Sequence, residues 1–385
     1  MSDVDQSPRD AKKIMIVFGT RPEAIKMAPV IKEIRNHGEF ELRVCITGQH
    51  REMLSQVLEL FDIKPDYDLR LMSPEQTLTE LTGKVIEGME GVFKNWRPEL
   101  VLVHGDTTTT FATSLAAYYQ QIPVGHVEAG LRTRDIYSPW PEELNRRMVG
   151  SISALHFSPT KRAAQNLLSE NISPENIHIT GNTVIDALLE VRERIENDLD
   201  IELNLANEFS FINKTKKLIL VTAHRRENFG EGFESICKAI LLIAERDDVQ
   251  VIYPVHLNPN VQEPVFRILG NNPNIHLIGP QDYLPFVYLM LSSHIILTDS
   301  GGIQEEAPSL GRPVLVLRDN TERPEAVEAE TVILVGTDSK KILESTNRLL
   351  DDNSYYNQMA TANNPYGDGT AAVRIVEALL KAGVG

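Results

Sequence analysis

The sequence predicts an α/β protein made of two doubly wound domains that face a cleft. The chain has 385 residues, more than one ordinary hydrophobic core accommodates. Short apolar runs alternate with helical stretches, which is typical of a parallel sheet covered by helices on both faces. This alternation occurs twice, and the pattern changes between the two series near residues 181–213.

The first series predicts a domain over residues 12–183, preceded by a polar stretch, 1–11, that we expect to be a mobile leader. Pro22 suits the first turn of the first helix, directly after a buried strand. The expected strands are 13–18, 42–47, 100–104 and 123–127. The first expected helix ends at about residue 37. The others cover residues 52–61, 76–95, 107–121 and 142–153.

The second series predicts another doubly wound domain over residues 184–368. Helical turns at about 184–198 lead into a polar connector at about 204–217. The expected strands, with helices between them, are 218–223, 249–254, 275–279, 294–299 and 313–317.

Composition excludes several classes of function. A formal net charge of −16 argues against a nucleic-acid partner, although a few arginines can still hold a small anion. Two distant cysteines exclude a disulfide framework and a cysteine-rich metal site. No apolar run approaches the roughly 18–20 residues of a membrane span, and the first residues lack a signal-peptide pattern. We therefore expect a cytoplasmic protein without a membrane partner.

Ligands of such sheets bind beyond the carboxyl ends of the strands, so the residues just after each strand are the informative ones. Arg21 and Lys26 follow the first strand and could form an anion site, or could be solvated charges beside a tight turn. Asp106 follows the strand at 100–104 and either caps the next helix or points into the cleft.

A long irregular segment after the strand at 123–127 carries Glu128, Glu142 and Arg146. Such a segment is a candidate active-site loop. The i,i+4 spacing of Glu142 and Arg146 also fits a simple salt bridge on a helix surface. Taken together with Asp106, the two glutamates favour paired acid and base chemistry.

In the second domain, Ser300, Gly301 and Gly302 follow a strand and open a helix, which is the strongest phosphate-binding signal in the chain. Glu306, one turn later, could accept ribose hydroxyl groups, and Arg323 could meet a diphosphate.

His224 follows the first strand of this domain beside two arginines. It could contact a phosphate, move a proton or be structural, whereas His256 is isolated and could be structural. The chain lacks GxGxxG after a strand, GxxxxGK[ST], HExxH and GxSxG, which argues against dinucleotide oxidoreductases, P-loop NTPases, zinc proteases and elbow-type hydrolases.

Nine motifs together resemble the non-hydrolysing UDP-N-acetylglucosamine 2-epimerases, and the resemblance extends from about residue 13 to the C-terminus. The motifs are FGTRPEAIKMAP, HGDTTTT, GHVEAGLRT, SPWPEELNR, GNTVIDAL, HRREN, PVHLNP, TDSGGIQEEAPSLG and TERPEAV.

The resemblance implies two Rossmann-like domains in a glycosyltransferase-B-like arrangement, with a last helix within residues 369–385 that returns to the first domain. It implies the interconversion of UDP-GlcNAc and UDP-ManNAc by elimination of UDP to a glycal and its re-addition. It implies a homodimer and neither a metal nor a nicotinamide cofactor. UDP-ManNAc made in this way commonly feeds the synthesis of surface polysaccharides.

The resemblance also implies roles for individual residues. The implied catalytic residues are Asp106, Glu128, Glu142 and His224. The residues implied around UDP are Arg21, Lys26, Arg146, Ser300, Gly301, Gly302 and Arg323, with Glu306 at the ribose and Gln281 and Phe286 near the uracil.

Many bacterial members bind a second UDP-GlcNAc as an activator beside the active site. Gln49, Glu142, Arg225 and His256 match that pattern. Glu52 and Glu75 depart from it, and two carboxylates there would repel a diphosphate.

Two alternatives share the fold. A hydrolysing 2-epimerase would release ManNAc and UDP, but that branch differs around the segment that here is GHVEAGLRT. A nucleotide-sugar glycosyltransferase would need an acceptor and usually lacks the three carboxylates. A third alternative is a non-catalytic nucleotide-sugar sensor. It would not need the intact set of acid and base residues that this sequence has.

Overall fold

The computed structural model describes residues 11–48, 51–73 and 76–382, and the side chains of residues 51–53 are not described. The predicted leader therefore lies almost wholly outside the described residues, as do Gln49 and Glu75, and nothing follows for the side chain of Glu52. The chain divides into two compact units. Unit 1 comprises the described residues up to Ala187 and those from Tyr366 onward, and unit 2 is Leu188–Pro365.

Unit 1 is built on a seven-stranded parallel sheet in the order β3-β2-β1-β4-β5-β6-β7. Its strands are β1 (Lys12–Phe18), β2 (Phe40–Ile46), β3 (Tyr67–Asp68), β4 (Leu100–His104), β5 (Val124–Val127), β6 (Leu155–Ser158) and β7 (Ile177–Ile179). Ile14 lies opposite Leu42 on one side and Leu100 on the other. The central strand is therefore buried between neighbours, which explains its continuous apolar run.

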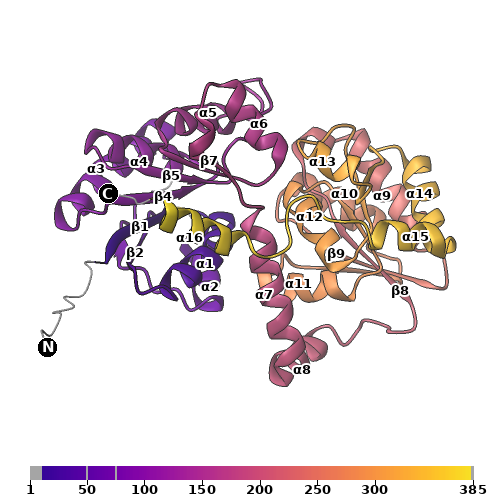
Figure 1. Cartoon of the computed structure of the whole chain (residues 1–385). Helices are drawn as coiled ribbons and strands as arrows, with labels where there is room; N and C mark the ends of the chain where they lie inside the picture. The colour runs from indigo at the N-terminus through magenta and orange to yellow at the C-terminus, as the bar shows by residue number, and fades with distance from the viewer. Residues whose placement is uncertain (1–10, 49–50, 74–75, 383–385) are drawn as a thin grey trace, which may run out of the picture. The chain divides into compact units, whose positions relative to one another are not determined.

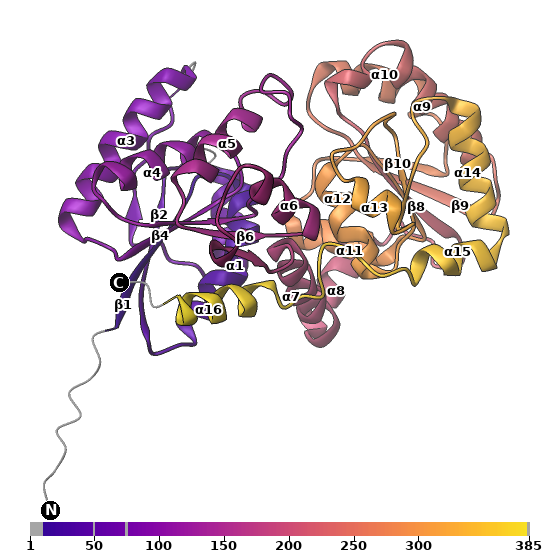
Figure 2. The ribbon, with the colours of Figure 1, turned by 45° about the horizontal axis from the view of Figure 1, so that its top comes forward.

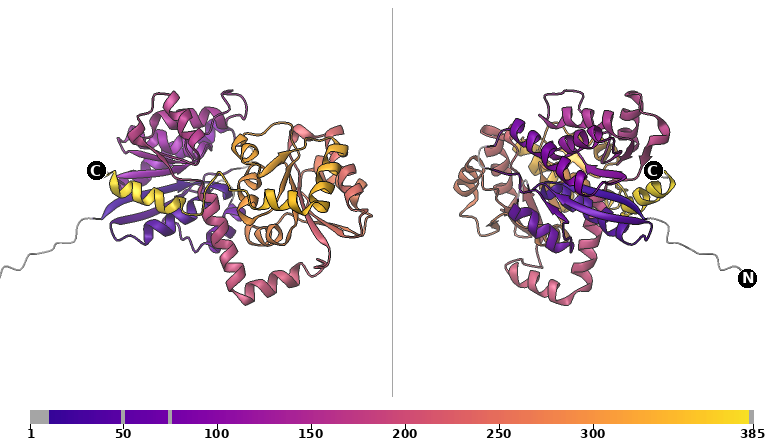
Figure 3. Two further views of the ribbon diagram at one scale, coloured as in Figure 1. Left: turned by 45° about the vertical axis from the view of Figure 1, so that its right-hand side comes forward. Right: turned by 90° about the vertical axis from the view of Figure 1, so that its left-hand side faces the viewer.

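Helices cover both faces of this sheet (Figure 2). They are α1 (Arg21–Arg35), α2 (Arg51–Leu60), α3 (Leu78–Asn95), α4 (Thr108–Tyr119), α5 (Glu142–Ile152), α6 (Lys161–Ser169) and α16 (Ala371–Lys381). On one face, Met15 and Val17 share a core with Val85 and Met89 of α3. On the other face, α16 packs against α1, and the yellow helix lies beside the indigo segments in each view (Figures 1 and 3).

Helix α7 (Thr183–Asn197) contains the boundary between the units. It is followed by α8 (Leu199–Glu208), which corrects the sequence expectation of a polar connector from about residue 204. The Asp198 side chain caps α8 by accepting hydrogen bonds from the backbone N–H groups of Asp200 (3.0 Å) and Ile201 (3.2 Å). This cap supports a helix in a segment whose polar composition otherwise suggests a loop.

Unit 2 is built on a six-stranded parallel sheet in the order β10-β9-β8-β11-β12-β13. Its strands are β8 (Lys217–Thr222), β9 (Val249–Pro254), β10 (Ile275–Ile278), β11 (Ile295–Thr298), β12 (Val314–Val316) and β13 (Val332–Leu334). Its remaining helices are α9 (Glu231–Ile243), α10 (Pro259–Leu269), α11 (Tyr283–Ser292), α12 (Gly301–Glu306), α13 (Pro324–Glu328), α14 (Ser339–Asp351) and α15 (Asn353–Ala360).

The predicted class, an α/β protein with two doubly wound parallel sheets, is confirmed. The sequence analysis did not identify β3, β6, β7 and β13. These strands have two to four residues, too few for a periodic signal, and β7 also carries partly exposed side chains. No helix among the described residues is long and apolar enough to cross a membrane.

The strand order reverses direction at one place in each sheet. In unit 1 this switch point lies between β1 and β4, and in unit 2 it lies between β8 and β11. The chain leaves neighbouring strands in opposite directions there, which opens a crevice at their carboxyl ends. The two switch points are therefore where functional side chains are expected.

Candidate active site

A buried glutamate holds together the switch point of unit 1. Glu23 lies in the first turn of α1, and its carboxylate accepts hydrogen bonds from the backbone N–H groups of Gly19 (3.0 Å) and Thr20 (2.8 Å). It also accepts hydrogen bonds from the hydroxyl groups of Thr107 (2.6 Å) and Thr110 (3.0 Å). Burial raises the pKa of Glu23, and these donors oppose that shift. The β1–α1 turn and the β4–α4 turn are thereby fixed to each other.

Glu128 follows β5 in a left-handed backbone conformation, with φ at +64°. A non-glycine residue in this region is strained, and such strain clusters at functional sites. The Glu128 carboxylate pairs with the Lys26 ammonium group and accepts a hydrogen bond from the Asn182 side chain (2.8 Å). This assembly joins residues from three segments that are far apart in the sequence.

A buried histidine lies next to this ion pair. His104, the last residue of β4, has its Nε2 atom 3.8 Å from Glu128 Oε2. Burial lowers the pKa of His104 to about 4, although the charge of Glu128 opposes that shift. The imidazole is consequently neutral at physiological pH.

Asp106 is paired with Arg146. The Asp106 carboxylate accepts a hydrogen bond from Arg146 Nε (2.9 Å) and forms an ion pair with Nη2 (2.8 Å), and Arg146 also contacts the buried Glu143 (3.2 Å). The interpretation of Asp106 as a helix cap is wrong, because Thr107 caps α4 through Thr110 N–H (3.1 Å).

The sequence alternative of a salt bridge between Glu142 and Arg146 is also not realised, since Arg146 contacts Asp106 and Glu143 instead. Glu142 begins α5, and its Oε2 atom is buried without a hydrogen-bond partner among the described residues. Unit 1 thus gathers Lys26, Asp106, Glu128 and Arg146 at one edge of its sheet, and Arg21 starts the helix that carries Lys26.

At the switch point of unit 2, His224 follows β8 and remains about 41% exposed at its side chain. Its ring stacks on the ring of His256, with centroids 5.1 Å apart. The backbone N–H groups of His224 (2.8 Å) and Arg225 (2.7 Å) donate to the fully buried carboxylate of Asp299. Burial lowers the pKa of His224, whereas the charge of Asp299 raises it.

The turn after β11 brings Ser300, Gly301 and Gly302 beside Arg323. A Cβ atom at position 301 would lie 2.9 Å from the guanidinium carbon of Arg323, so any larger residue there would displace the guanidinium group from this position. The buried Glu305 orients Arg323 by accepting a hydrogen bond from its Nε atom (2.9 Å). A backbone turn and a fixed guanidinium group are a suitable combination for a phosphate.

The predicted ribose and base residues lie on the neighbouring elements. The buried Glu306 accepts a hydrogen bond from the Tyr283 hydroxyl group (2.7 Å) at the start of α11. Gln281 donates to the Gly279 carbonyl (2.9 Å), and Phe286 is half-buried on α11. These residues therefore come from the β10–α11 and β11–α12 connections of one unit.

Residues that matter for the geometry were missed by the sequence analysis. They are buried polar groups that hold other site residues: Glu23, His104, Glu143, Asn182, Asp299 and Glu305. Glu23 had a usable signal, because Thr20-x-x-Glu23 is a capping-box pattern. Asp299 was assigned to the end of a strand, where no pattern distinguishes it.

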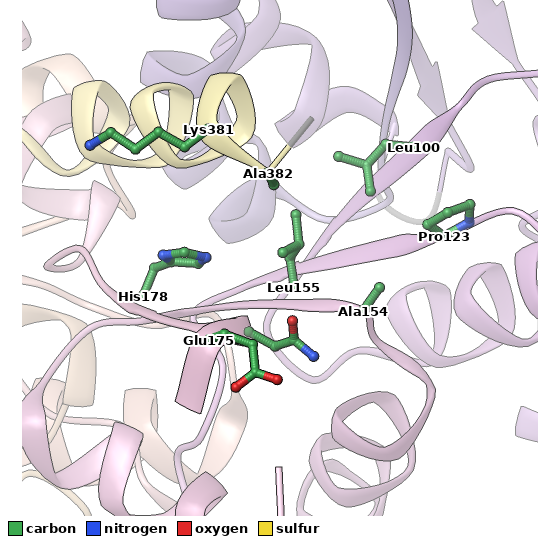
Figure 4. A pocket seen from close by; sticks show the side chains of 9 residues that line it. Leu100, Pro123, Ala154, Leu155, Glu175, His178, Lys381 and Ala382 are labelled. Atoms are coloured by element: carbon green, nitrogen blue, oxygen red, sulfur yellow. The ribbon is translucent and has the colours of Figure 1, made fainter. Parts of the chain in front are cut away.

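A cavity of about 430 Å³ occurs elsewhere in unit 1, at the amino ends of the strands (Figure 4). Leu100 begins β4, and Pro123 and Ala154 precede β5 and β6. The cavity is thus at the opposite edge from the candidate site. No group of three or more His, Cys, Asp or Glu residues that could hold a metal ion occurs in the part of the chain that the structure describes.

Comparison with known proteins gives consistent results. A family model described as UDP-N-acetylglucosamine 2-epimerase matches residues 32–380. The UDP-N-acetylglucosamine 2-epimerase of Escherichia coli strain K12 is 61% identical over 368 residues, covering 95% of this chain and 98% of the relative.

Two solved structures are also similar. The UDP-GlcNAc 2-epimerase of Neisseria meningitidis, solved with UDP-GlcNAc, is 57% identical with a TM-score of 0.90, covering 96% of this chain and 100% of that one. The UDP-GlcNAc 2-epimerase of Methanocaldococcus jannaschii, solved with UDP-GlcNAc and UDP, is 35% identical with a TM-score of 0.80. The match covers 96% of this chain and 99% of that one.

Proposed function

Because this chain belongs to the UDP-N-acetylglucosamine 2-epimerase family, we propose that it interconverts UDP-GlcNAc and UDP-ManNAc without net hydrolysis. The observation that carries the proposal is the pair of chemically different switch points. Unit 1 collects carboxylates that are already paired with Lys26 and Arg146, which suits proton transfer. Unit 2 offers a glycine turn beside Arg323, which suits a diphosphate.

The chemistry of the reaction explains why both kinds of group are needed. The C2 proton of the sugar is next to an acetal carbon, so its removal gives no stabilised enolate. Elimination solves this difficulty: UDP leaves C1, a proton leaves C2, and a glycal forms. UDP then adds back to C1 after C2 receives a proton on the opposite face. The enzyme must stabilise the departing diphosphate and supply acid and base groups on both faces of the ring.

We assign the two halves of the substrate accordingly. Ser300, Gly301, Gly302 and Arg323 stabilise the diphosphate, while Glu306 accepts the ribose hydroxyl groups. Gln281 and Phe286 contact the uracil. Arg21, Lys26 and Arg146 add positive charge for the leaving UDP.

Asp106, Glu128, Glu142 and His224 exchange protons with the sugar. The ion pair with Lys26 favours the carboxylate form of Glu128, which is the form that can accept a proton. The Asp106 carboxylate is likewise paired with the Arg146 guanidinium group. The buried Oε2 of Glu142 has no donor among the described residues, and we propose that a sugar hydroxyl or a transferred proton satisfies it.

Four further features are proposed. The protein acts as a homodimer in the cytoplasm, and its product feeds polysaccharide synthesis. A second UDP-GlcNAc binds as an activator near Arg225 and His256. That last feature predicts sigmoidal kinetics and a requirement for UDP-GlcNAc in the reverse direction, and hyperbolic kinetics in both directions would contradict it.

The test is incubation of the protein with UDP-GlcNAc in D₂O, followed by NMR of the sugar protons. We expect UDP-ManNAc with deuterium at C2 and no accumulation of free sugar. Free ManNAc with UDP would instead identify the hydrolysing reaction. No change in the presence of either nucleotide sugar would refute the proposed function and favour a glycosyltransferase.

A further inference from the structure

Asp299 has an unusual environment at the switch point of unit 2. It directly follows β11 and is fully buried. Its Oδ2 atom accepts three hydrogen bonds: from the backbone N–H groups of His224 (2.8 Å) and Arg225 (2.7 Å) and from the Asn228 amide (3.4 Å). One carboxylate oxygen therefore fixes the path of the chain after β8.

The second oxygen of the same carboxylate is not satisfied in this way. Asp299 Oδ1 is buried and has no hydrogen-bond partner among the described residues. His224 Nδ1 lies 3.7 Å away, which is slightly too far for a hydrogen bond. Leaving a buried carboxylate oxygen without a donor is costly, so a small rotation of the imidazole toward Oδ1 is favoured. Hydrogen bonds of catalytic groups commonly shorten when the substrate binds.

We propose that Asp299 is a positioning residue that accepts a hydrogen bond from His224 Nδ1 and thereby makes Nε2 the nitrogen that exchanges a proton with the substrate. The inference rests on the proposed proton-transfer role of His224. In the neutral imidazole the proton is on Nδ1, and the lone pair of Nε2 is free. When Nε2 takes a proton, the resulting imidazolium faces the Asp299 carboxylate. When Nε2 returns that proton, the ring is neutral again in the same tautomer.

The other charged or titratable groups near His224 act in the opposite direction. The ring of His256 stacks on it at an interplanar angle of 14°, and Arg225 is its neighbour in the chain. Charge on either group lowers the pKa of His224, as does burial, whereas the charge of Asp299 raises it. Removing the Asp299 charge therefore leaves only influences that disfavour the imidazolium.

The first test uses the unmodified protein. Histidine ¹⁵N NMR identifies which ring nitrogen of neutral His224 carries the proton, and the signal is assigned by its loss in His224→Gln. We expect the Nδ1–H tautomer. The Nε2–H tautomer would overturn the proposal, because Nδ1 could not then donate to Asp299.

The second test is Asp299→Asn, which keeps an oxygen that can accept the two backbone N–H bonds. We expect a lower pKa of His224 and a turnover number reduced by about 10²–10⁴-fold, the range for a lost acid or base function. The limb of the pH–rate profile that His224 controls should move to lower pH, whichever form of the ring is active. An unchanged His224 pKa in a folded variant would reduce Asp299 to a purely structural role.

Asp248→Asn is the matched control, because it removes the same charge from a half-exposed site in unit 2 where Asp248 pairs with Arg246. It should leave the titration of His224 unchanged. If Asp299→Asn does not fold, the tautomer in the unmodified protein still decides the question. The NMR result is independent of turnover. A protein in which His224 has the Nδ1–H tautomer but which has no epimerase activity would therefore refute the proposed function and leave the role of Asp299 in place.

Discussion

Glu128 illustrates how a single residue combines conformational strain with chemistry. It adopts a φ of +64°, and its carboxylate contacts both Lys26 and Asn182. Unusual backbone geometry at a charged residue costs on the order of 1 kcal/mol or more, and the surrounding contacts must compensate for it. The geometry is therefore consistent with selection for function at this position.

Glu128→Gln should lower the turnover number by about 10²–10⁴-fold, because an amide cannot accept the proton that the carboxylate removes. The affinity for UDP should stay within about twofold, since Glu128 itself is not among the residues assigned to UDP and glutamine keeps an oxygen that can accept a hydrogen bond from Lys26. Steady-state kinetics and calorimetric titration with UDP measure the two quantities. Glu90→Gln is the control, because Glu90 is a half-exposed residue of α3 that pairs with Lys94. Normal turnover in Glu128→Gln would remove this residue from the mechanism.

Arg323→Ala should mainly weaken nucleotide binding. Hydrogen bonds to charged groups contribute about 1.5–3 kcal/mol, so the dissociation constant of UDP should rise roughly 10- to 100-fold. Calorimetry with UDP measures this, and a melting curve reports the cost of removing the Arg323 ion pair from the buried Glu305. Arg267→Ala, at a half-exposed residue that pairs with Glu234 and Glu263, is the control. An unaltered UDP affinity would contradict the assigned role.

At the scale of residues, the sequence located the carboxylates and arginines at the strand ends but not the groups that orient them. An apolar run shows where a buried strand ends and therefore which residues follow it. Whether Asp106 caps α4 or meets Arg146 depends on a side-chain rotamer and on a residue 40 positions away. The role of Asp299 likewise depends on a contact with the turn after β8. No local pattern contains that information.

At the scale of elements, α16 shows how a distant segment completes a unit. Its first turn is held by Asp186, whose carboxylate accepts a hydrogen bond from the backbone N–H group of Ala372 (2.8 Å). Its buried face includes Ile375, Val376 and Leu379. Burial raises the pKa of Asp186 to about 6, so this group is ionised at pH 7.5 and can act as an anionic cap.

Asp186→Ala should therefore loosen α16. Loss of a helix cap costs about 1 kcal/mol, so we expect a lower free energy of unfolding and faster amide hydrogen exchange in α16 at pH 7.5. Asp338→Ala is the matched control, because Asp338 caps α14 in unit 2 through Lys341 N–H (2.8 Å). That control should leave exchange in α16 unchanged. Equal exchange rates in α16 of both variants would show that Asp186 does not hold this helix.

The sequence predicted long elements better than short ones. The strand at 100–104 and the strand at 249–254 match β4 and β9 residue for residue. Both are fully apolar or nearly so and lie inside a sheet, where burial alone defines the pattern. The two-residue β3 forms by pairing with β2, and this pairing depends on the tertiary structure rather than on the local sequence.

At the scale of the whole molecule, buried histidines couple stability to pH. Burial lowers the pKa of His104 to about 4 and that of His126 to about 3. The unfolded chain binds a proton at each histidine below about pH 6.5, and the folded protein does not. The free energy of unfolding should therefore fall as the pH is lowered from about 6.5 toward 4. Each of these two histidines should contribute a loss of about 2 kcal/mol between pH 7 and pH 5.

Urea unfolding at pH 7 and pH 5 tests this coupling. His126→Gln removes one of the two groups, so the difference in unfolding free energy between the two pH values should shrink by about 2 kcal/mol. This readout does not depend on how much the substitution changes stability at pH 7. The same difference in both proteins would show that His126 does not contribute to acid sensitivity.

The return of α16 to α1 also has a consequence for how the protein is made. Helix α1 is synthesised before unit 2 and α16 after it, so unit 1 lacks one of its covering helices until all of unit 2 has been synthesised. All the residues of unit 2 are available before then. The usual order of co-translational folding, from the N-terminus onward, is thereby reversed for the final step. A ribosome stalled shortly before residue 371 would carry a chain in which every residue of unit 2 has been synthesised while unit 1 still lacks α16.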